Sequence, residues 1–319
     1  MTTYIIRRLL WSLLIIILLT LLIFFAMRLL PGDPLIIFLG STSSYSSVGP
    51  EGLAQLRHQY GLDQPIMIQY FHWVGGVLHG DLGQSIFYHE SVGSLIRTRF
   101  PVTLNIGLAA FVIATVLGTA SGLLAGLRRG KLADQIVTPL AYVGITVPIF
   151  WLGILLIYVF GLKAHLLPIG GYVSPFTDFA GNIKMLIMPV ACECVTGVAS
   201  VSRQMRSSVM EVTSQDFIRT AWSKGLPERA IVLKHILKNS LIPVVTLAGF
   251  AIGSIFGGSV LIETVFNIPG MGRLMVSSIF NQDYVVVEAC TLIFGAIILG
   301  INLIVDISYG WLDPRIRYG

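Results

Sequence analysis

Glu193 and its two neighbours carry residue types that could serve chemistry inside an apolar stretch of the chain. Glu193 lies between Cys192 and Cys194 in a run with no other charge. A carboxylate within a membrane is expensive, so it is by default a candidate for function. Side chains two positions apart point to opposite sides of a helix, so the two thiols cannot readily share one metal ion. We therefore assign no metal ligand. Glu193 either lines a pathway that attracts a cationic group or is a protonated or paired structural residue.

A polar segment, residues 203–243, separates two apolar runs and is the second candidate site. Its pattern predicts a helix, a break at Gly225 and a second helix. Residues 208–211 fit a capping box, and residues 213–216 offer another helix start. A basic amphipathic segment of this kind can rest on anionic lipid. A short helix that ends in small residues, Ala221 and Gly225, can equally enter a cleft on another protein.

The composition shows what must position these residues. Of the 319 residues, 55% are hydrophobic and 12% are charged, whereas soluble domains carry about 25% charged residues. Six apolar runs are each near the ~20 residues that a helix needs to cross a bilayer. We therefore predict an all-α integral membrane protein with six transmembrane helices, at residues 9–30, 102–127, 136–162, 185–201, 240–262 and 289–309.

The distribution of cations predicts the orientation of the chain. Most Lys and Arg residues fall on one side of the predicted spans, including the polar segment. The positive-inside rule then favours cytoplasmic termini. We expect a cytoplasmic N-terminus and first helix at 1–30, an extracytoplasmic loop at 31–101, a core transmembrane domain at 102–312 with a cytoplasmic loop at 203–241, and a cytoplasmic tail at 313–319.

Two predicted helices carry glycines at every fourth position. Small residues of this kind mark close packing faces in membranes, either within one chain or against a second subunit. Pro148 falls inside the third predicted span and should kink it, as a gating hinge or as local geometry. The glycines are Gly118, Gly122 and Gly126 in the second span and Gly249, Gly253 and Gly257 in the fifth.

The sequence lacks the motif that binds ATP in P-loop proteins. That motif needs two glycines in fixed register, followed by Lys and then Ser or Thr. The nearest approach, at Gly130 and Lys131, has Ala125 in the first glycine position and Leu132 in place of Ser or Thr. We therefore expect that the chain alone is not an ATPase and that it binds neither a cofactor nor nucleic acid.

Short motifs spread over nearly the whole chain resemble permeases of ABC importers, and most closely the dipeptide/oligopeptide/nickel permease family. Each motif is weak alone, but their order and spacing are specific. At 219–221 the chain has Arg-Thr-Ala where the general cytoplasmic EAA loop has Glu-Ala-Ala. The motifs are P-G-D-P (31–34), G-L-D-Q-P (61–65), G-D-L-G (80–83), D-F-I-R-T-A-x-x-K-G (216–225), H-x-L-x-N (235–239), I-P-V-V-T (242–246), P-G-M-G-R (269–273), D-Y (283–284) and D-P-R-I-R (313–317).

The resemblance implies a fold, a set of partners and a location. The fold is the six-span type I importer permease, paired with a second, related permease. Two ATP-binding subunits would carry ATP and Mg and would dock on the cytoplasmic loops. An extracytoplasmic binding protein would deliver the cargo. The whole assembly would lie in the bacterial inner membrane.

The resemblance also implies that residues 216–226 form a coupling helix for the ATP-binding subunit. Apolar side chains would fill a groove on that subunit, and cations would form ion pairs at its rim. The groove-filling residues are Phe217, Ile218 and Trp222, the rim cations are Arg219 and Lys224, Gly225 permits close approach, and Asp216, Ala221 and Leu226 complete the site.

Two other classes of function compete with an importer permease. A self-sufficient ion-coupled carrier would need inverted repeats and more ionisable groups inside the membrane. A membrane-anchored scaffold would use the basic loop only to bind lipid. For a permease, we expect small peptides as cargo, with nickel or metal chelates, glutathione and opines as alternatives.

Overall fold

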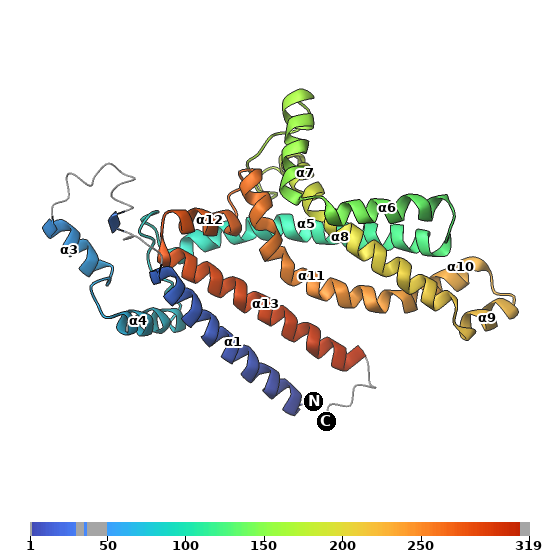
Figure 1. Cartoon of the computed structure of the whole chain (residues 1–319), viewed down its shortest axis with the longest axis horizontal. Helices are drawn as coiled ribbons and strands as arrows, with labels where there is room; N and C mark the ends of the chain where they lie inside the picture. Colours follow the sequence, from blue (N-terminus) through green and yellow to red (C-terminus); the bar gives the residue numbers. More distant parts are fainter. Residues whose placement is uncertain (1, 30–34, 37–49, 313–319) are drawn as a thin grey trace. The chain divides into compact units, whose positions relative to one another are not determined.

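The computed structural model describes residues 2–29, 35–36 and 50–312, and its described part is built from helices, as predicted. The described residues also contain one isolated antiparallel β-bridge, between Gln84 and Ser91. The chain divides into two compact units, described separately below. In order, the elements are α1 (Thr2–Leu29), α3 (Pro50–Gln59), α4 (Ile66–Leu78), α5 (Val92–Leu127), α6 (Leu132–Thr146), α7 (Ile149–Leu156), the π-helical η1 (Ile157–Lys163), α8 (Phe179–Thr213), α9 (Asp216–Ser223), α10 (Glu228–Ala230), the π-helical η2 (Ile231–Leu237), α11 (Lys238–Val265), α12 (Met271–Phe280) and α13 (Tyr284–Leu312) (Figure 1).

The predicted spans correspond to long apolar helices. Within the described residues, five helices are long and apolar enough to cross a membrane. A bent pair, Leu132–Thr146 with Ile149–Lys163, gives six if it is counted as one span, and its two parts are bent by 101°. The five continuous spans are Ile6–Leu29, Val92–Leu127, Phe179–Thr213, Glu228–Gly253 and Tyr284–Val305.

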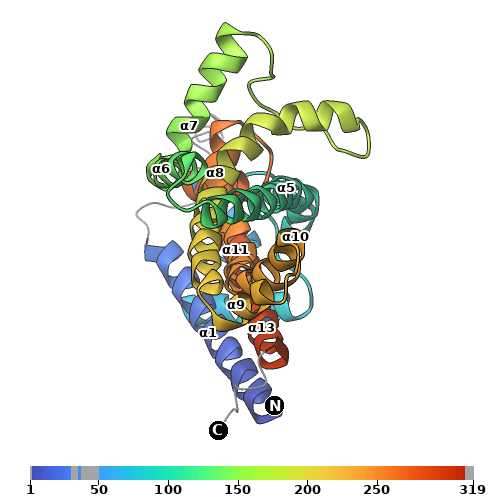
Figure 2. The same cartoon turned by 90° about the vertical axis from the view of Figure 1, so that its right-hand side faces the viewer.

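The third predicted span, which we expected as one kinked helix, is instead broken at Pro148. Val147 ends α6 in an extended conformation (φ −68°, ψ 125°), and Pro148 precedes α7 with φ −63° and ψ 126°. Proline has no N–H to donate and disfavours helical geometry in the residue before it, so helices tend to end there. α7 therefore stands across the direction of α6 (Figure 1), and a loop leads from η1 to the start of α8 (Figure 2).

The first unit comprises residues 1–101 and 269–303 with the C-terminal segment from 310. The C-terminal part of α1 packs on α13, where Met27 forms a buried cluster with Tyr284 and Val287. Arg28 forms a salt bridge with Glu288. This cation and this carboxylate lie in apolar helices, where pairing offsets the loss of hydration.

The second unit, residues 102–268 and 304–309, is held by close helix contacts. A Cβ added at Gly118 would lie 2.7 Å from the Val201 side chain, and one at Gly122 would lie 2.3 Å from the Ser202 carbonyl oxygen. A Cβ at Gly126 would likewise meet Val209 of α8 at 2.7 Å. This stripe therefore packs α5 against α8 within the chain, one of the two alternatives above.

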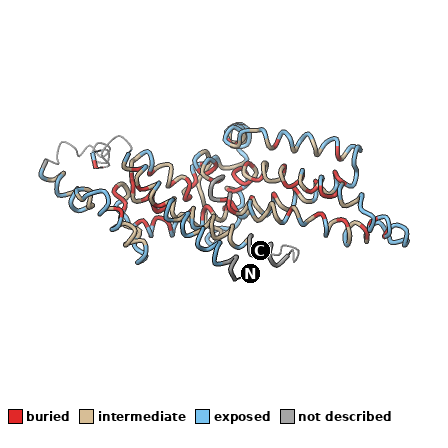
Figure 3. The backbone as a smooth tube through the Cα atoms, turned by 60° about the horizontal axis from the view of Figure 1, so that its bottom comes forward, coloured by how far each residue is buried: buried red, intermediate tan, exposed pale blue. Residues whose placement is uncertain are grey.

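The second glycine stripe is described in part. A Cβ at Gly249 would lie 2.8 Å from Val305, so this glycine also permits a contact within the chain. Gly253 is buried, and the surroundings of Gly257 lie outside the description. Buried and exposed positions alternate along the helices of both units (Figure 3).

Several predicted boundaries were wrong. α8 continues to Thr213, so the capping box expected at 208–211 lies inside a helix, and the next helix starts at Asp216. α11 continues to Val265, which puts Glu263 inside the helix and not in the following loop. The long helices override local capping signals because tertiary packing outweighs them. The motifs at 31–34 and 313–317 and the tail at 313–319 lie outside the described residues.

Candidate functional site

The predicted coupling residues lie on α9, a two-turn helix set off from α8 by a sharp turn. Gln215 precedes α9 in an extended conformation (φ −74°, ψ 148°), and its carbonyl accepts hydrogen bonds from the N–H groups of Ile218 and Arg219. At the other end, Gly225 has φ +71°, a conformation that suits glycine. Its N–H donates to the Trp222 carbonyl over 2.9 Å. The predicted break at Gly225 is confirmed.

The inner face of α9 is fixed to the rest of the second unit. Ile218 and Ala221, three positions apart, are 2% and 5% exposed. They belong to a buried cluster with Met205 and Val209 of α8 and Ile231 of η2. We expected Ile218 to fill a groove on a partner. Its side chain is instead enclosed by its own chain. It lies on the same face of α9 as the buried Ala221, because side chains three positions apart on a helix share one face. Ile218 and Ala221 therefore position α9 instead of presenting a surface.

The outer face of α9 carries large apolar side chains. Phe217 is 45% exposed, Trp222 is 49% exposed and Leu226, just beyond the helix, is 37% exposed. A helix fixed on one side and aromatic on the other can fill a groove on a partner protein.

The charged residues of α9 are exposed. Arg219 Nη1 lies 3.5 Å from Asp216 Oδ1, one turn away on the same helix. Such a long, solvated pair contributes little to stability, so both groups remain open to a partner. Lys224 is exposed at the C-terminal end.

An ion pair that the sequence reasoning missed joins α8 to the start of α6. Arg206 Nε and Nη2 donate to Asp134 Oδ1 and Oδ2 over 2.6 and 3.0 Å. The carboxylate also accepts from the Gly130 N–H at 2.9 Å and from Thr138 Oγ1 at 2.9 Å. A bidentate pair with further donors has a single preferred geometry. No sequence signal marked it, because its members are 72 positions apart.

Glu193 lies in the middle of α8, as predicted, and is partly exposed. Its Oε2 is buried and has no hydrogen-bond partner. Cys192 and Cys194 on either side are buried free thiols in the core cluster of the second unit. Within the described residues, no three His, Cys, Asp or Glu side chains are placed to hold a metal ion.

Another carboxyl group, Glu263 of α11, interacts electrostatically with Glu193. Glu263 is fully buried, and its Oε1 accepts a hydrogen bond from Thr103 Oγ1 over 2.6 Å. The predicted span at 240–262 stops one residue before Glu263, whereas α11 continues through it to Val265.

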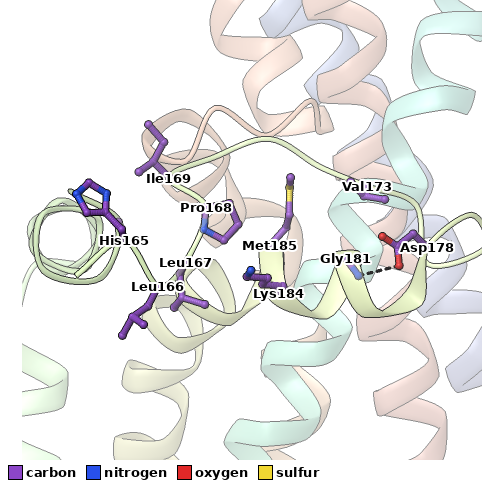
Figure 4. A pocket seen from close by; sticks show the side chains of 11 residues that line it. His165, Leu166, Leu167, Pro168, Ile169, Val173, Asp178, Gly181, Lys184 and Met185 are labelled. Carbon is purple, nitrogen blue, oxygen red and sulfur yellow. Dashed lines mark hydrogen bonds between the residues drawn. The ribbon is translucent and has the colours of Figure 1, made fainter. Parts of the chain in front are cut away.

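A cavity of about 510 Å³ lies between the end of η1 and the first turns of α8. His165, Leu166 and Pro168 line it from the connecting loop, and Lys184 and Met185 line it from α8 (Figure 4). Asp178 Oδ1 accepts from the Gly181 N–H at its edge, which caps α8. Neither Glu193 nor Pro148 belongs to its lining.

Comparison with known proteins agrees with this architecture. Residues 118–318 match the family "Binding-protein-dependent transport system inner membrane component", and residues 1–107 match the corresponding N-terminal family. The chain is 39% identical over 319 residues to the oligopeptide transport system permease protein OppB of Escherichia coli, with all of both chains covered. It is 38% identical over 320 residues to a Brucella ovis protein named as a peptide permease, covering 99% of each. A Sinorhizobium fredii protein named as a peptide ABC transporter permease is 36% identical over 318 residues, again over all of both chains. The chain belongs to the family of inner membrane components of binding-protein-dependent transport systems, and is therefore a multi-pass membrane permease component.

Proposed function

We propose that this chain is the permease subunit of an ATP-driven importer of small peptides and forms one half of the translocation pathway. A homologous second permease supplies the other half, and an extracytoplasmic binding protein delivers the peptide. The names of the full-length relatives support peptides over nickel chelates, glutathione or opines. The missing P-loop motif supports placing ATP and Mg on two separate ATP-binding subunits.

α9 is the proposed coupling helix, with both chain termini in the cytoplasm. The observation that carries this assignment is the division of α9 into two faces. Ile218 and Ala221 are buried in the chain, while Phe217 and Trp222 are about half exposed. Aromatic side chains are frequent anchors of protein interfaces. A loop that only binds lipid would not need its helix fixed by a buried cluster.

The contacts around α9 support a rigid-body mechanism. α9 shares a buried cluster with α8, and α8 packs closely on the glycines of α5. The Asp134–Arg206 pair links α8 to α6, which leads to the break at Pro148. When the ATP-binding subunits close, the displacement of α9 would be carried by these contacts to the spanning helices.

Glu193 is the proposed pathway residue. Its position in the middle of a spanning helix, its partial exposure and its unpaired Oε2 support contact with a cationic group of the cargo. The amino terminus of a peptide is such a group. Pro148 is the second proposed pathway residue, through the break that it imposes between α6 and α7.

Uptake into proteoliposomes tests this function. The complete complex is reconstituted with its binding protein and labelled dipeptides, and ATP or a proton or sodium gradient is applied. The proposal expects uptake with ATP and none with a gradient alone. Uptake driven by a gradient without ATP would favour the ion-coupled carrier. ATP-driven uptake of a nickel chelate in preference to peptides would retain the machinery and change the cargo.

A further inference from the structure

α4 (Ile66–Leu78) lies in the predicted extracytoplasmic loop but packs along α1. Tyr70 Oη lies 3.0 Å from Thr20 Oγ1, and the Phe24 ring is 5.2 Å from the Tyr70 ring and 6.0 Å from the Trp73 ring. Tyr70 and Trp73, three positions apart, thus form one face of α4 that is directed at α1.

The contacts on α1 lie within its membrane-spanning stretch. An 18-residue stretch of α1 within Ile6–Leu29 has a mean hydropathy of 3.0. Thr20 precedes Leu29 by nine positions on the helix, which corresponds to about 13 Å at the α-helical rise. α4 is therefore attached to a part of α1 that lies at the depth of the lipid and not beyond it.

A second face of α4 is apolar, and the described part of the chain leaves it uncovered except at Val74, which is partly buried. Met67, Phe71, Val74 and Leu78 follow the spacing i, i+4, i+7, i+11, which places them in one stripe. Met67 is 60% exposed, Phe71 is 68% exposed and Leu78 is 80% exposed. On the side of α1 that faces away from α4, Leu22, two positions after Thr20, is 67% exposed.

The remaining side of α4 combines polar residues with Ile68, which is 45% exposed, and the helix before it is polar. His72 is exposed and follows Phe71 by about 100° around the helix. α3 (Pro50–Gln59) contains Glu51, Gln55 and Arg57, all of them exposed. A helix with one packed face, one apolar face and one polar edge is the pattern of an interfacial membrane helix.

We propose that α4 lies in the outer leaflet of the bilayer and that its apolar stripe, residues Met67, Phe71, Val74 and Leu78, contacts lipid. α4 is held against the membrane-spanning stretch of α1 through Tyr70. α4 thereby holds the preceding α3 at the membrane surface. The proposal requires that α1 spans the membrane and is independent of the cargo.

Site-specific fluorescence quenching tests this placement. The three native cysteines, Cys192, Cys194 and Cys290, are replaced by alanine, and an environment-sensitive fluorophore is attached at one new cysteine. The labelled variants are Phe71→Cys and Met67→Cys on the stripe, His72→Cys on the polar edge, and two references, Leu22→Cys on α1 and Gln55→Cys on α3. The complete complex is placed in lipid nanodiscs. One quencher is a lipid nitroxide near the head group, and the other is a water-soluble nickel chelate.

The stripe labels should respond as Leu22→Cys does, losing emission with the lipid nitroxide and keeping it with the chelate. His72→Cys and Gln55→Cys should show the reverse. Quenching of the stripe labels by the chelate would overturn the proposal by placing the stripe in water. Protection of both stripe labels from both quenchers would also overturn it, because a protein partner would then cover the stripe.

Discussion

Arg206 of α8 and Asp134 of α6 form a bidentate ion pair, with N–O distances of 2.6 and 3.0 Å. The Asp134 side chain is 9% exposed and the Arg206 side chain is 26% exposed. Asp134 also accepts hydrogen bonds from Gly130 and Thr138. The pair therefore joins two helices at a point where each carboxylate oxygen of Asp134 accepts two hydrogen bonds.

Removing the cation of this pair should destabilise the second unit and uncouple transport. Arg206→Gln leaves the Asp134 carboxylate with two neutral donors. The loss of a charged hydrogen bond should lower the free energy of unfolding by about 1.5–3 kcal/mol. We expect a lower melting temperature in detergent and more ATP hydrolysed per peptide taken up. The matched control is Arg203→Gln, an exposed arginine one turn earlier on α8, which should behave as wild type.

A charge reversal distinguishes a specific site from simple attraction. In Asp134→Arg with Arg206→Asp, the Gly130 N–H and the Thr138 hydroxyl would face a cation. We therefore expect that the double variant recovers little of the stability. Full recovery of the melting temperature would show that the hydrogen bonds to Asp134 are unimportant.

Adding a methyl group at Gly122 should separate α5 from α8. The new Cβ would lie 2.3 Å from the Ser202 carbonyl oxygen, and backbone cannot move as a flexible side chain can. Overpacking of this kind costs about 1–3 kcal/mol. Gly93→Ala in the same helix has open space around its Cβ and should be neutral or stabilising by up to ~1 kcal/mol. Thermal unfolding of both variants tests the close packing of α5 on α8 at Gly122. Equal melting temperatures would contradict it.

Asp283, in the loop before α13, should make stability depend on pH. Burial raises the pKa of its carboxyl group, although Ser85 Oγ and the Phe87 N–H donate to Oδ2. Since the folded pKa lies above the unfolded value of about 3.9, the folded state is favoured below that value and loses stability as pH rises through the folded pKa. Asp283→Asn keeps an acceptor and does not ionise, so its melting temperature should fall less over this range. Glu51→Gln, at an exposed position, is the control. If the melting temperature of Asp283→Asn depended on pH as steeply as that of the wild type, the assignment would be contradicted.

Glu193→Gln should discriminate between peptides by their charge. If the carboxylate contacts the peptide amino terminus, the loss of one charge-assisted bond is worth about 1.4 kcal/mol, or a factor of ten in KM. We expect that KM rises for a free dipeptide and is unchanged for its N-acetylated form. Equal effects on both peptides in an uptake assay would indicate a structural role.

The sequence predicted the spans and the break at Gly225 because both have strong local signals, whereas the coupling role of α9 came from the family resemblance and stays a prediction. Apolar runs of about 20 residues need a membrane, and a glycine soon followed by a proline favours the end of a helix. The break at Pro148 was predicted as a kink, and the size of the bend was not, because it depends on what α7 packs against.

Contacts between distant residues could not be read from the sequence. The pairs Asp134–Arg206 and Thr103–Glu263 depend on which helices become neighbours. The burial of Ile218 is a case of the same kind, since periodicity gives the faces of α9 but not which face turns inward. Each of these missed features is a product of tertiary packing.

The central claim is that α9 transmits force from a separate ATPase, and truncation of its exposed aromatic residues tests it most directly. Phe217→Ala and Trp222→Ala remove the outer face without touching the buried Ile218. Loss of an aromatic anchor costs about 2 kcal/mol or more in binding.

The decisive measurement is the amount of ATP-binding subunit that co-purifies with each variant, taken together with ATP-driven peptide uptake. Leu132→Ala, at a side chain 70% exposed at the start of α6, is the matched control. The account predicts that both quantities fall together in Phe217→Ala and Trp222→Ala and stay at the wild-type level in Leu132→Ala. Wild-type retention of the ATP-binding subunit with wild-type uptake in both α9 variants would contradict it.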